Sequence, residues 1–339
     1  MKQRQLGTST QTSPVDGSST DPLTTSAIGL GCMGLSQGYG ATDDLESIRL
    51  IQRAVDLGVK MLDTAISYGQ GHNETLIGEA LAGRREGVTV ATKFGIIRDE
   101  RGVHLDARPE HVSGYCDASL QRLGVEAIDL YYLHRVDPQV PVADTVGAMS
   151  ELVQAGKVRH LGLSEVTADQ LAQATAVHQI TAVQLEWSLL WRQPEADIVP
   201  AARRHGAGLV PYSPLGRGLL TATLDHTNVD TSDFRRSDAR FHGTHLQDNL
   251  RQVAALREIA DSLHITAGQL ALAWLLAQGP DIVPIPGTRH LDRLADNVAA
   301  ADIRLDPADL HRLEEALSHL AWAGDRHSFA VPVTTRTPS

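Results

Sequence analysis

The stretch "AIGLGCMG" at residues 27–34 decides between two α/β folds. Its three glycines have the spacing of the dinucleotide-binding fingerprint, in which glycine lets the backbone approach a pyrophosphate at the N-terminus of a helix. In a Rossmann fold that helix starts inside the motif, and an acidic residue follows about 20 residues later to bind a ribose hydroxyl. Here the stretch "LSQGYGAT" (35–42) separates the glycines from the first helix cap, and the acid that ends the next apolar run, Asp63, comes later than the fingerprint requires. The glycine pattern is therefore not a Rossmann signal.

Eight short runs of apolar and β-branched residues recur along the chain, and none alternates cleanly between apolar and polar positions. Such runs are typical of strands that are buried on both faces of a parallel sheet. Helix-like segments lie between them; the segment at 42–58, for example, has Thr42 or Asp43 as its cap and Gly58 as its stop. Because strand and helix alternate eight times, the sequence predicts an α/β fold of the (β/α)₈ or TIM-barrel class. The predicted strands are 26–31, 59–65, 88–95, 128–134, 158–165, 182–188, 208–216 and 282–288.

The chain divides into three parts by composition. Residues 1–25 are polar and rich in Ser and Thr, and we expect a partly flexible segment that includes a short hairpin. Residues 26–326 hold all the strand–helix repeats and are expected to form a single barrel, whereas 327–339 form a polar tail. Within the barrel, the stretch at 221–245 is polar and lacks apolar periodicity. A loop of that length in a compact domain is usually functional or disordered, and we expect a lid at the C-terminal face.

The composition excludes several classes of partner. The formal net charge of −11 argues against a general binder of nucleic acid or of anionic membranes, whose surface would be basic. Only Cys32 and Cys116 are present, so a disulfide framework is not expected and a reducing compartment fits. The first residues lack the apolar core of a signal peptide, and the most apolar later stretch, 270–277, is too short to span a bilayer. We therefore expect a soluble, cytoplasmic protein.

Ionisable side chains stand at the ends of several predicted strands. In a (β/α)₈ barrel, catalytic residues come from the C-terminal ends of different strands. Asp63, with Tyr68 just beyond it, Lys93 and His134 all occupy such ends. Each has an ordinary structural explanation, since the acid could cap a turn, the lysine could extend to solvent and the histidine could be a core residue. Four such groups at one barrel mouth favour an active site.

The sequence resembles the aldo-keto reductase family. The resemblance is carried by "GLGCMG", "LDTAISYG", "ATKFG", "DLYYLHRVD", "GLSE", "VQLEWSLL", "PYSPLGRG" and "IPGTRHLDRLADN", which keep the family's order from about residue 26 to about residue 326. It implies a barrel that binds a nicotinamide cofactor, usually NADPH, without a Rossmann domain and interconverts carbonyls and alcohols. It also implies a catalytic tetrad of Asp63, Tyr68, Lys93 and His134.

The implied reaction gives each member of the tetrad a role. Hydride addition to a carbonyl leaves negative charge on the oxygen, which needs a proton and nearby donors. Tyr68 is expected to be the general acid, with the charge of Lys93 lowering its pKa from ~10 by roughly 1–3 units. Asp63 would hold Lys93 charged and oriented, and His134 would hydrogen-bond the carbonyl oxygen. In the reverse direction Tyr68 would act as the base.

The resemblance also assigns the cofactor contacts. Ser164 and Gln184 would bind the carboxamide, Tyr212 would stack under the nicotinamide, and Ser213, Leu215 and Arg217 would lie along the pyrophosphate. The start of the helix after the eighth strand would bring backbone N–H groups to a phosphate. Arg289 and Arg293 would bind a 2′-phosphate, which favours NADP over NAD, and Asp296 and Asn297 would meet the adenine. Two departures from the family pattern are Glu165, where asparagine or arginine is common, and Trp187, where tyrosine is common. The remaining predicted cofactor residues are Met33, Asp63, Gly287 and Thr288.

Other functions remain open alternatives. Lys93 on a barrel strand could form a Schiff base, as in barrel aldolases, and the family also includes non-catalytic NADPH-sensing subunits of membrane channels. The pair His242 and His245 lacks the ligand set of a zinc site, so no metal is expected. A small-molecule carbonyl is the expected substrate, selected by the loops at 134–142 and 216–247 and by the tail. The sequence fixes neither its identity nor whether the protein is a monomer or a homo-oligomer.

Overall fold

The computed structural model describes residues 1–8, 21–100, 102–224, 230–318 and 322–326. The predicted tail at 327–339 and positions 9–20 of the polar N-terminal segment lie outside the described residues.

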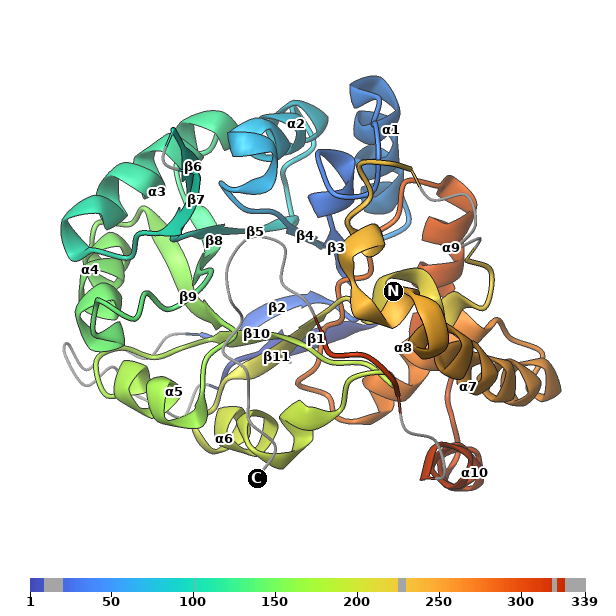
Figure 1. The fold of residues 1–339 in the computed structure, drawn as a ribbon. Coiled ribbons are helices and arrows are strands. Elements are labelled where there is room, and N and C mark those ends of the chain that lie inside the picture. Colours follow the sequence, from blue (N-terminus) through green and yellow to red (C-terminus); the bar gives the residue numbers. More distant parts are fainter. Residues whose placement is uncertain (9–20, 101, 225–229, 319–321, 327–339) are drawn as a thin grey trace.

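Seven parallel strands form the central sheet and follow one another around it in sequence order. Their register brings the carboxyl ends to one edge, because Gly31 pairs with Asp63 and Lys93 pairs with Tyr132. Helices surround the strands, with α1 to α6 in ring order (Figure 1). The sheet strands are β3 (Leu30–Gly31), β4 (Met61–Asp63), β5 (Thr89–Phe94), β8 (Ile128–Leu133), β9 (Val158–Ser164), β10 (Ala182–Glu186) and β11 (Gly208–Tyr212).

The predicted eighth strand closes the barrel as an irregular segment. Ile282 forms a single parallel bridge with Leu209, and the N–H of Gly29 donates to the carbonyl of Pro284 at 3.0 Å. The segment therefore bonds to the strands on both sides of it. It contains two prolines, which have no N–H to donate, so a continuous ladder cannot form. The (β/α)₈ fold is confirmed, and its eighth strand is replaced by a segment that joins its neighbours through individual backbone hydrogen bonds.

The helices begin and end largely where local signals place them. Asp43, rather than Thr42, caps α1, since its side chain accepts from the N–H of Glu46 at 2.9 Å. Thr266 and Gln269 form a capping box at the start of α8. The helices are α1 (Asp44–Asp56), α2 (His72–Ala80), α3 (Pro109–Leu123), α4 (Val142–Gln154), α5 (Ala168–Thr175), α6 (Ile198–Arg204), α7 (Gly243–Ser262), α8 (Ala267–Ala277), α9 (Leu291–Ala299) and α10 (Pro307–Ser318).

The long polar stretch before α8 holds more structure than its sequence indicates. Helical turns at Phe234–Ser237 and Ala239–Phe241 lie in the stretch, and α7 begins inside it at Gly243. A further turn at Gly216–Thr221 leads into the stretch. In Figure 1, α7 extends outward beside α8. In the described part of the chain no single helix has the length and apolarity to cross a membrane, and α7 with α8 passes that test only as a pair bent by 85°.

A two-stranded hairpin covers the N-terminal end of the barrel. β1 (Gln3–Leu6) pairs antiparallel with β2 (Leu23–Ser26). Leu6 and Leu23 are buried in the same apolar cluster as the residues that fill the barrel interior. Arg4 donates to the carbonyls of Leu276 in α8, of Gly279 just after it and of Ile282 in the eighth strand segment, at 2.6 to 2.8 Å. The hairpin occupies this end, so the ends of the strands that carry the predicted site form the other, open end.

Candidate active site

A cavity of about 720 Å³ opens at the C-terminal ends of the strands. That volume is in the range of sites that enclose small molecules and cofactors. Of the predicted site residues, only Lys93 and Ser164 do not line it, and both are fully buried. The predicted residues that line it are Met33, Asp63, Tyr68, His134, Gln184, Tyr212, Ser213, Leu215, Arg217, Gly287, Thr288, Arg289, Arg293, Asp296 and Asn297.

Lys93 and Asp63 form a buried ion pair beneath the cavity. The Nζ of Lys93 donates to Oδ1 of Asp63 at 2.5 Å and to the carbonyl of Thr64 at 2.7 Å. The other carboxylate oxygen, Oδ2, accepts from Nε2 of Gln184 at 2.7 Å. Burial alone would lower the pKa of Lys93, but the adjacent carboxylate outweighs it and the pKa is raised. The lysine is therefore held as a fixed cation.

Tyr68 lies next to this cation. Its Oη is 3.5 Å from Nζ of Lys93, and Nζ is 5.0 Å from the centre of its ring. Burial raises the pKa of Tyr68, and the charge of Lys93 only partly offsets that rise. The charge of Lys93 does act to lower this pKa, but the prediction that it would bring the pKa below its usual value is wrong, because desolvation of the phenolate is the larger effect. At neutral pH the phenol carries its proton.

His134 completes the group at the end of β8. Its ring lies edge-on to that of Tyr68, with 5.8 Å between the centroids. Its pKa lies well below the usual value because the ring is buried and because Arg135 and Lys93 are both positive. A neutral imidazole has one N–H to donate, which suits a hydrogen bond to a carbonyl oxygen. The four predicted groups thus meet at one place.

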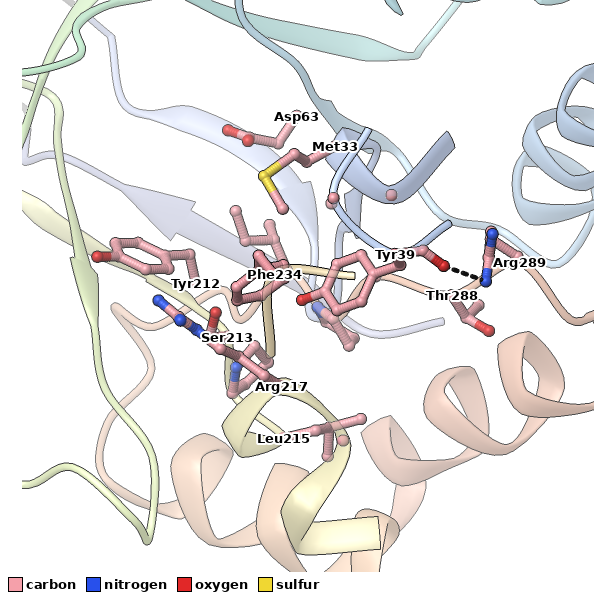
Figure 2. A pocket seen from close by; sticks show the side chains of 18 of the residues that line it. Met33, Tyr39, Asp63, Tyr212, Ser213, Leu215, Arg217, Phe234, Thr288 and Arg289 are labelled. Atoms are coloured by element: carbon pink, nitrogen blue, oxygen red, sulfur yellow. Dashed lines mark hydrogen bonds between the residues drawn. The ribbon is translucent and has the colours of Figure 1, made fainter. Parts of the chain in front are cut away.

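The opposite end of the cavity lies against the start of α9. Both Nη atoms of Arg289 donate to backbone carbonyls, those of Tyr39 and Ala41, each at 2.8 Å; Figure 2 shows the bond to Tyr39. Arg289 therefore ties the loop that follows the glycine motif to this end of the cavity. The side chain of Arg293 is exposed and has no hydrogen-bond partner within the described ranges. The N-terminus of α9 and Arg293 together provide N–H donors and positive charge for an anion.

Part of the polar stretch before α7 crosses to the same loop. The N–H of Phe234 donates to the carbonyl of Gly38 at 3.1 Å, and its ring lies edge-on to Tyr39 with 4.9 Å between the centroids. The guanidinium of Arg217 lies 4.7 Å from the centre of the Phe234 ring and donates to Asp238 at 2.7 Å. Figure 2 shows Tyr39, Phe234 and Arg217 grouped at the cavity. Sequence reasoning missed both aromatic residues because nothing local marks them.

Glu165, one of the two departures from the family pattern, binds the C-terminal segment. Its carboxylate accepts from both Nη atoms of Arg326, at 3.0 and 2.5 Å, and from the N–H of Glu186 at 2.9 Å. Burial would raise the pKa of Glu165, but the guanidinium lowers it to about 2. Glu186 in turn accepts from Arg240 at 2.8 Å. Glu165 is thus paired with Arg326, and Glu186 with Arg240.

The described residues show no metal centre. No three His, Cys, Asp or Glu side chains among them gather as a metal site requires, and His242 and His245 lie at the start of α7.

Comparison with known proteins gives one consistent family. Residues 27–318 match the family model for the aldo/keto reductase family. A probable aldo-keto reductase of Glycine max is 43% identical over 305 residues, which cover 89% of this chain and 88% of the relative. The solved glycerol dehydrogenase of Gluconobacter oxydans superposes with a TM-score of 0.83 at 28% identity, covering 97% of this chain and 99% of that one. An aldo/keto reductase of Klebsiella pneumoniae, solved with NADP and acetate, gives a TM-score of 0.67 at 25% identity, covering 90% and 95%.

Proposed function

Since this chain belongs to the aldo/keto reductase family, we propose that it reduces an aldehyde or ketone to the alcohol with NADPH, and that Tyr68 is the general acid. The family points to carbonyl reduction with a nicotinamide cofactor. One observation supports the assignment of Tyr68 as the general acid. The side chains of Asp63, Lys93, Tyr68 and His134 lie together at the end of one cavity.

The residues present fit a phosphorylated dinucleotide. The cavity runs from Tyr68 to the start of α9, where Arg293 is exposed with no side-chain partner in the ranges the structure covers. Two neighbours in fold, both from Klebsiella pneumoniae, were solved with NADP and with NADPH. Tyr212 lines the cavity and would support the nicotinamide ring. When bound, NADPH supplies the hydride that is added to the carbonyl carbon.

The protein's own groups supply the proton and the orientation. His134, held neutral, donates its N–H to the carbonyl oxygen and sets its angle. Tyr68 gives its proton to the same oxygen as negative charge develops there, and Lys93 stabilises the phenolate that remains. Asp63 keeps Lys93 charged and fixed through the 2.5 Å bond. This arrangement also disfavours a Schiff base, because such a lysine must be neutral to attack a carbonyl.

Reduction should depend little on pH across the neutral range. The raised pKa of Tyr68 keeps the acid protonated, and the lowered pKa of His134 keeps the imidazole neutral. A profile of kcat for reduction should therefore be flat from about pH 7 to about pH 9 and fall only as the phenol loses its proton, above its usual pKa of about 10. A fall of kcat centred near neutral pH would contradict this assignment.

Removing the exposed cation at α9 should change the choice of cofactor. We expect Arg293→Ala to raise the Kd for NADPH about 10- to 100-fold, the value of a lost charge-assisted hydrogen bond, and to leave the Kd for NADH unchanged. Fluorescence titration of the two cofactors measures this directly. Arg304→Ala, an exposed arginine outside the cavity, is the matched control. An unaltered ratio of the two affinities in Arg293→Ala would remove the argument for the phosphorylated cofactor.

The test of the proposed function is a screen of NADPH oxidation with aldehydes and ketones of several classes, in the wild type and in Tyr68→Phe. We expect turnover with at least one class that is lost in the variant. Binding of NADPH without turnover of any carbonyl would instead support a cofactor-sensing role.

A further inference from the structure

Arg135 lies beside the catalytic groups but has no part in the proposed proton transfer. It follows His134 at the end of β8, and its Nη1 donates to the carbonyl of His134 at 2.6 Å and to Oγ of Ser164, at the end of β9, at 3.0 Å. These bonds hold the guanidinium across the ends of two adjacent strands. After burial, its charge is the next cause of the lowered pKa of His134, and it also acts on Tyr68. The guanidinium is therefore close to the reacting centre.

One edge of this guanidinium is unused. Nε is shielded from solvent and has no acceptor, and in the parts of the chain that the structure describes Arg135 forms no ion pair. Nε–H and Nη2–H point in parallel and match the two oxygens of a carboxylate. Among the described residues, six other arginines bind an Asp or Glu carboxylate through this same edge: Arg108, Arg122, Arg192, Arg203, Arg235 and Arg240.

The neighbouring acids are already paired elsewhere. Asp63 is bonded to Lys93, Glu165 to Arg326 and Glu186 to Arg240. A partly buried charge with an unpaired donor is unfavourable, so an acceptor is expected to satisfy it. Arg135 lines the cavity, which is the route by which an acceptor from outside the chain reaches it.

A second arginine in the cavity lining, Arg98, follows β5, the strand that pairs with β8. Arg98 is exposed on β6 (Ile96–Asp99), which pairs with β7 (Gly102–Leu105) in a hairpin directly after the strand of Lys93. It lines the cavity and has no acidic partner within the described ranges. Ile96 and Val103 from the same hairpin add apolar surface to this wall. The wall thus combines apolar contact with two positive charges.

We propose that the substrate is a carbonyl compound that also bears a carboxylate, which binds the free edge of Arg135 and is attracted by Arg98. This rests on the proposed function, because it names the class of substrate for the same site. The reaction is unchanged in its balance: the carbonyl carbon gains a hydride, the oxygen gains a proton, and the carboxylate keeps its charge.

The test uses two pairs of aldehydes in which methylation of the carboxylate removes its charge: 4-carboxybenzaldehyde with its methyl ester, and 4-oxobutanoate with its methyl ester. For the wild type, we expect kcat/KM to favour the anion about 10-fold or more in at least one pair. Arg135→Gln should lose about 10- to 100-fold in kcat/KM for the anion, mostly through KM, and less than about 3-fold for the ester. Arg98→Gln, at an exposed position that does not threaten folding, should lose about 3- to 10-fold for the anion alone. Arg257→Gln on α7, an exposed arginine outside the cavity, is the matched control.

Three results would overturn the proposal. The first is a wild type without preference for the anion in either pair. The second is an equal loss of kcat/KM for anion and ester in Arg135→Gln, together with a higher Kd for NADPH in a fluorescence titration. That result would mean that Arg135 binds the cofactor and not the substrate. The third is an unchanged ratio of anion to ester in both variants. In each of these cases, the proposed function would still stand if the aldehyde group of the methyl esters continued to be reduced and that reduction depended on Tyr68. If the proposed function itself failed, no carbonyl compound would be turned over.

Discussion

Replacing Tyr68 with phenylalanine is expected to lower kcat by about 10²- to 10⁴-fold, the value of a positioned proton donor. The change removes one oxygen from a group that lies 3.5 Å from Nζ of Lys93 and lines the cavity. The ring remains, so the fold and the Kd for NADPH should not change. Steady-state kinetics and cofactor titration of the same preparation measure both effects.

Tyr131→Phe is the matched control. Its hydroxyl is buried without a partner in the described structure, and the residue does not line the cavity. Removing it relieves an unpaired buried group, so activity should be retained and stability should be unchanged or higher. Equal turnover in Tyr68→Phe and Tyr131→Phe would show that another group supplies the proton.

The second large effect is expected at Lys93. Lys93→Met leaves the carboxylate of Asp63 buried beside only the amide of Gln184. Breaking a buried ion pair by removing one partner destabilises a protein by about 3–5 kcal/mol. We expect a loss of this size in the free energy of unfolding measured in urea, together with a loss of turnover, because the phenolate of Tyr68 would no longer be stabilised.

A double variant separates the two effects. In the double variant Asp63→Asn/Lys93→Met, both charges of the buried pair are removed, so neither is left without its partner. Most of the stability lost in Lys93→Met should therefore return. Turnover should stay low, because the cation next to Tyr68 is still missing. Recovery of turnover along with stability would show that the ion pair serves the fold and not the reaction.

The barrel and the family were readable from the sequence because their signals are local. Each strand and its catalytic side chain are adjacent in the chain, so the ends of β4, β5 and β8 mark Asp63, Lys93 and His134 without knowledge of the fold. Parallel pairing in register then brings these ends together. The roles of these residues remain predictions, although the structure places them at one cavity.

What could not be read depends on contacts between distant segments. The bond between Glu165 and Arg326 joins residues 161 positions apart, and no local pattern announces it. The bonds from Arg289 to two backbone carbonyls of a loop near the other end of the chain are likewise not marked in the sequence, and its predicted contact with a phosphate stays a prediction. The pKa of Tyr68 was predicted in the wrong direction because burial, which the sequence does not give, outweighs the nearby charge of Lys93.

The most direct test of the central claim uses NADPH in which both hydrogens at C4 of the nicotinamide are deuterium. The reduced product of a carbonyl accepted by the wild type is analysed by NMR, and Tyr68→Phe is run under the same conditions. The account predicts one deuterium on the carbinol carbon with the wild type and at least about 100-fold slower formation of that product with the variant. Product without deuterium, or the same rate of labelling in Tyr68→Phe, would contradict it.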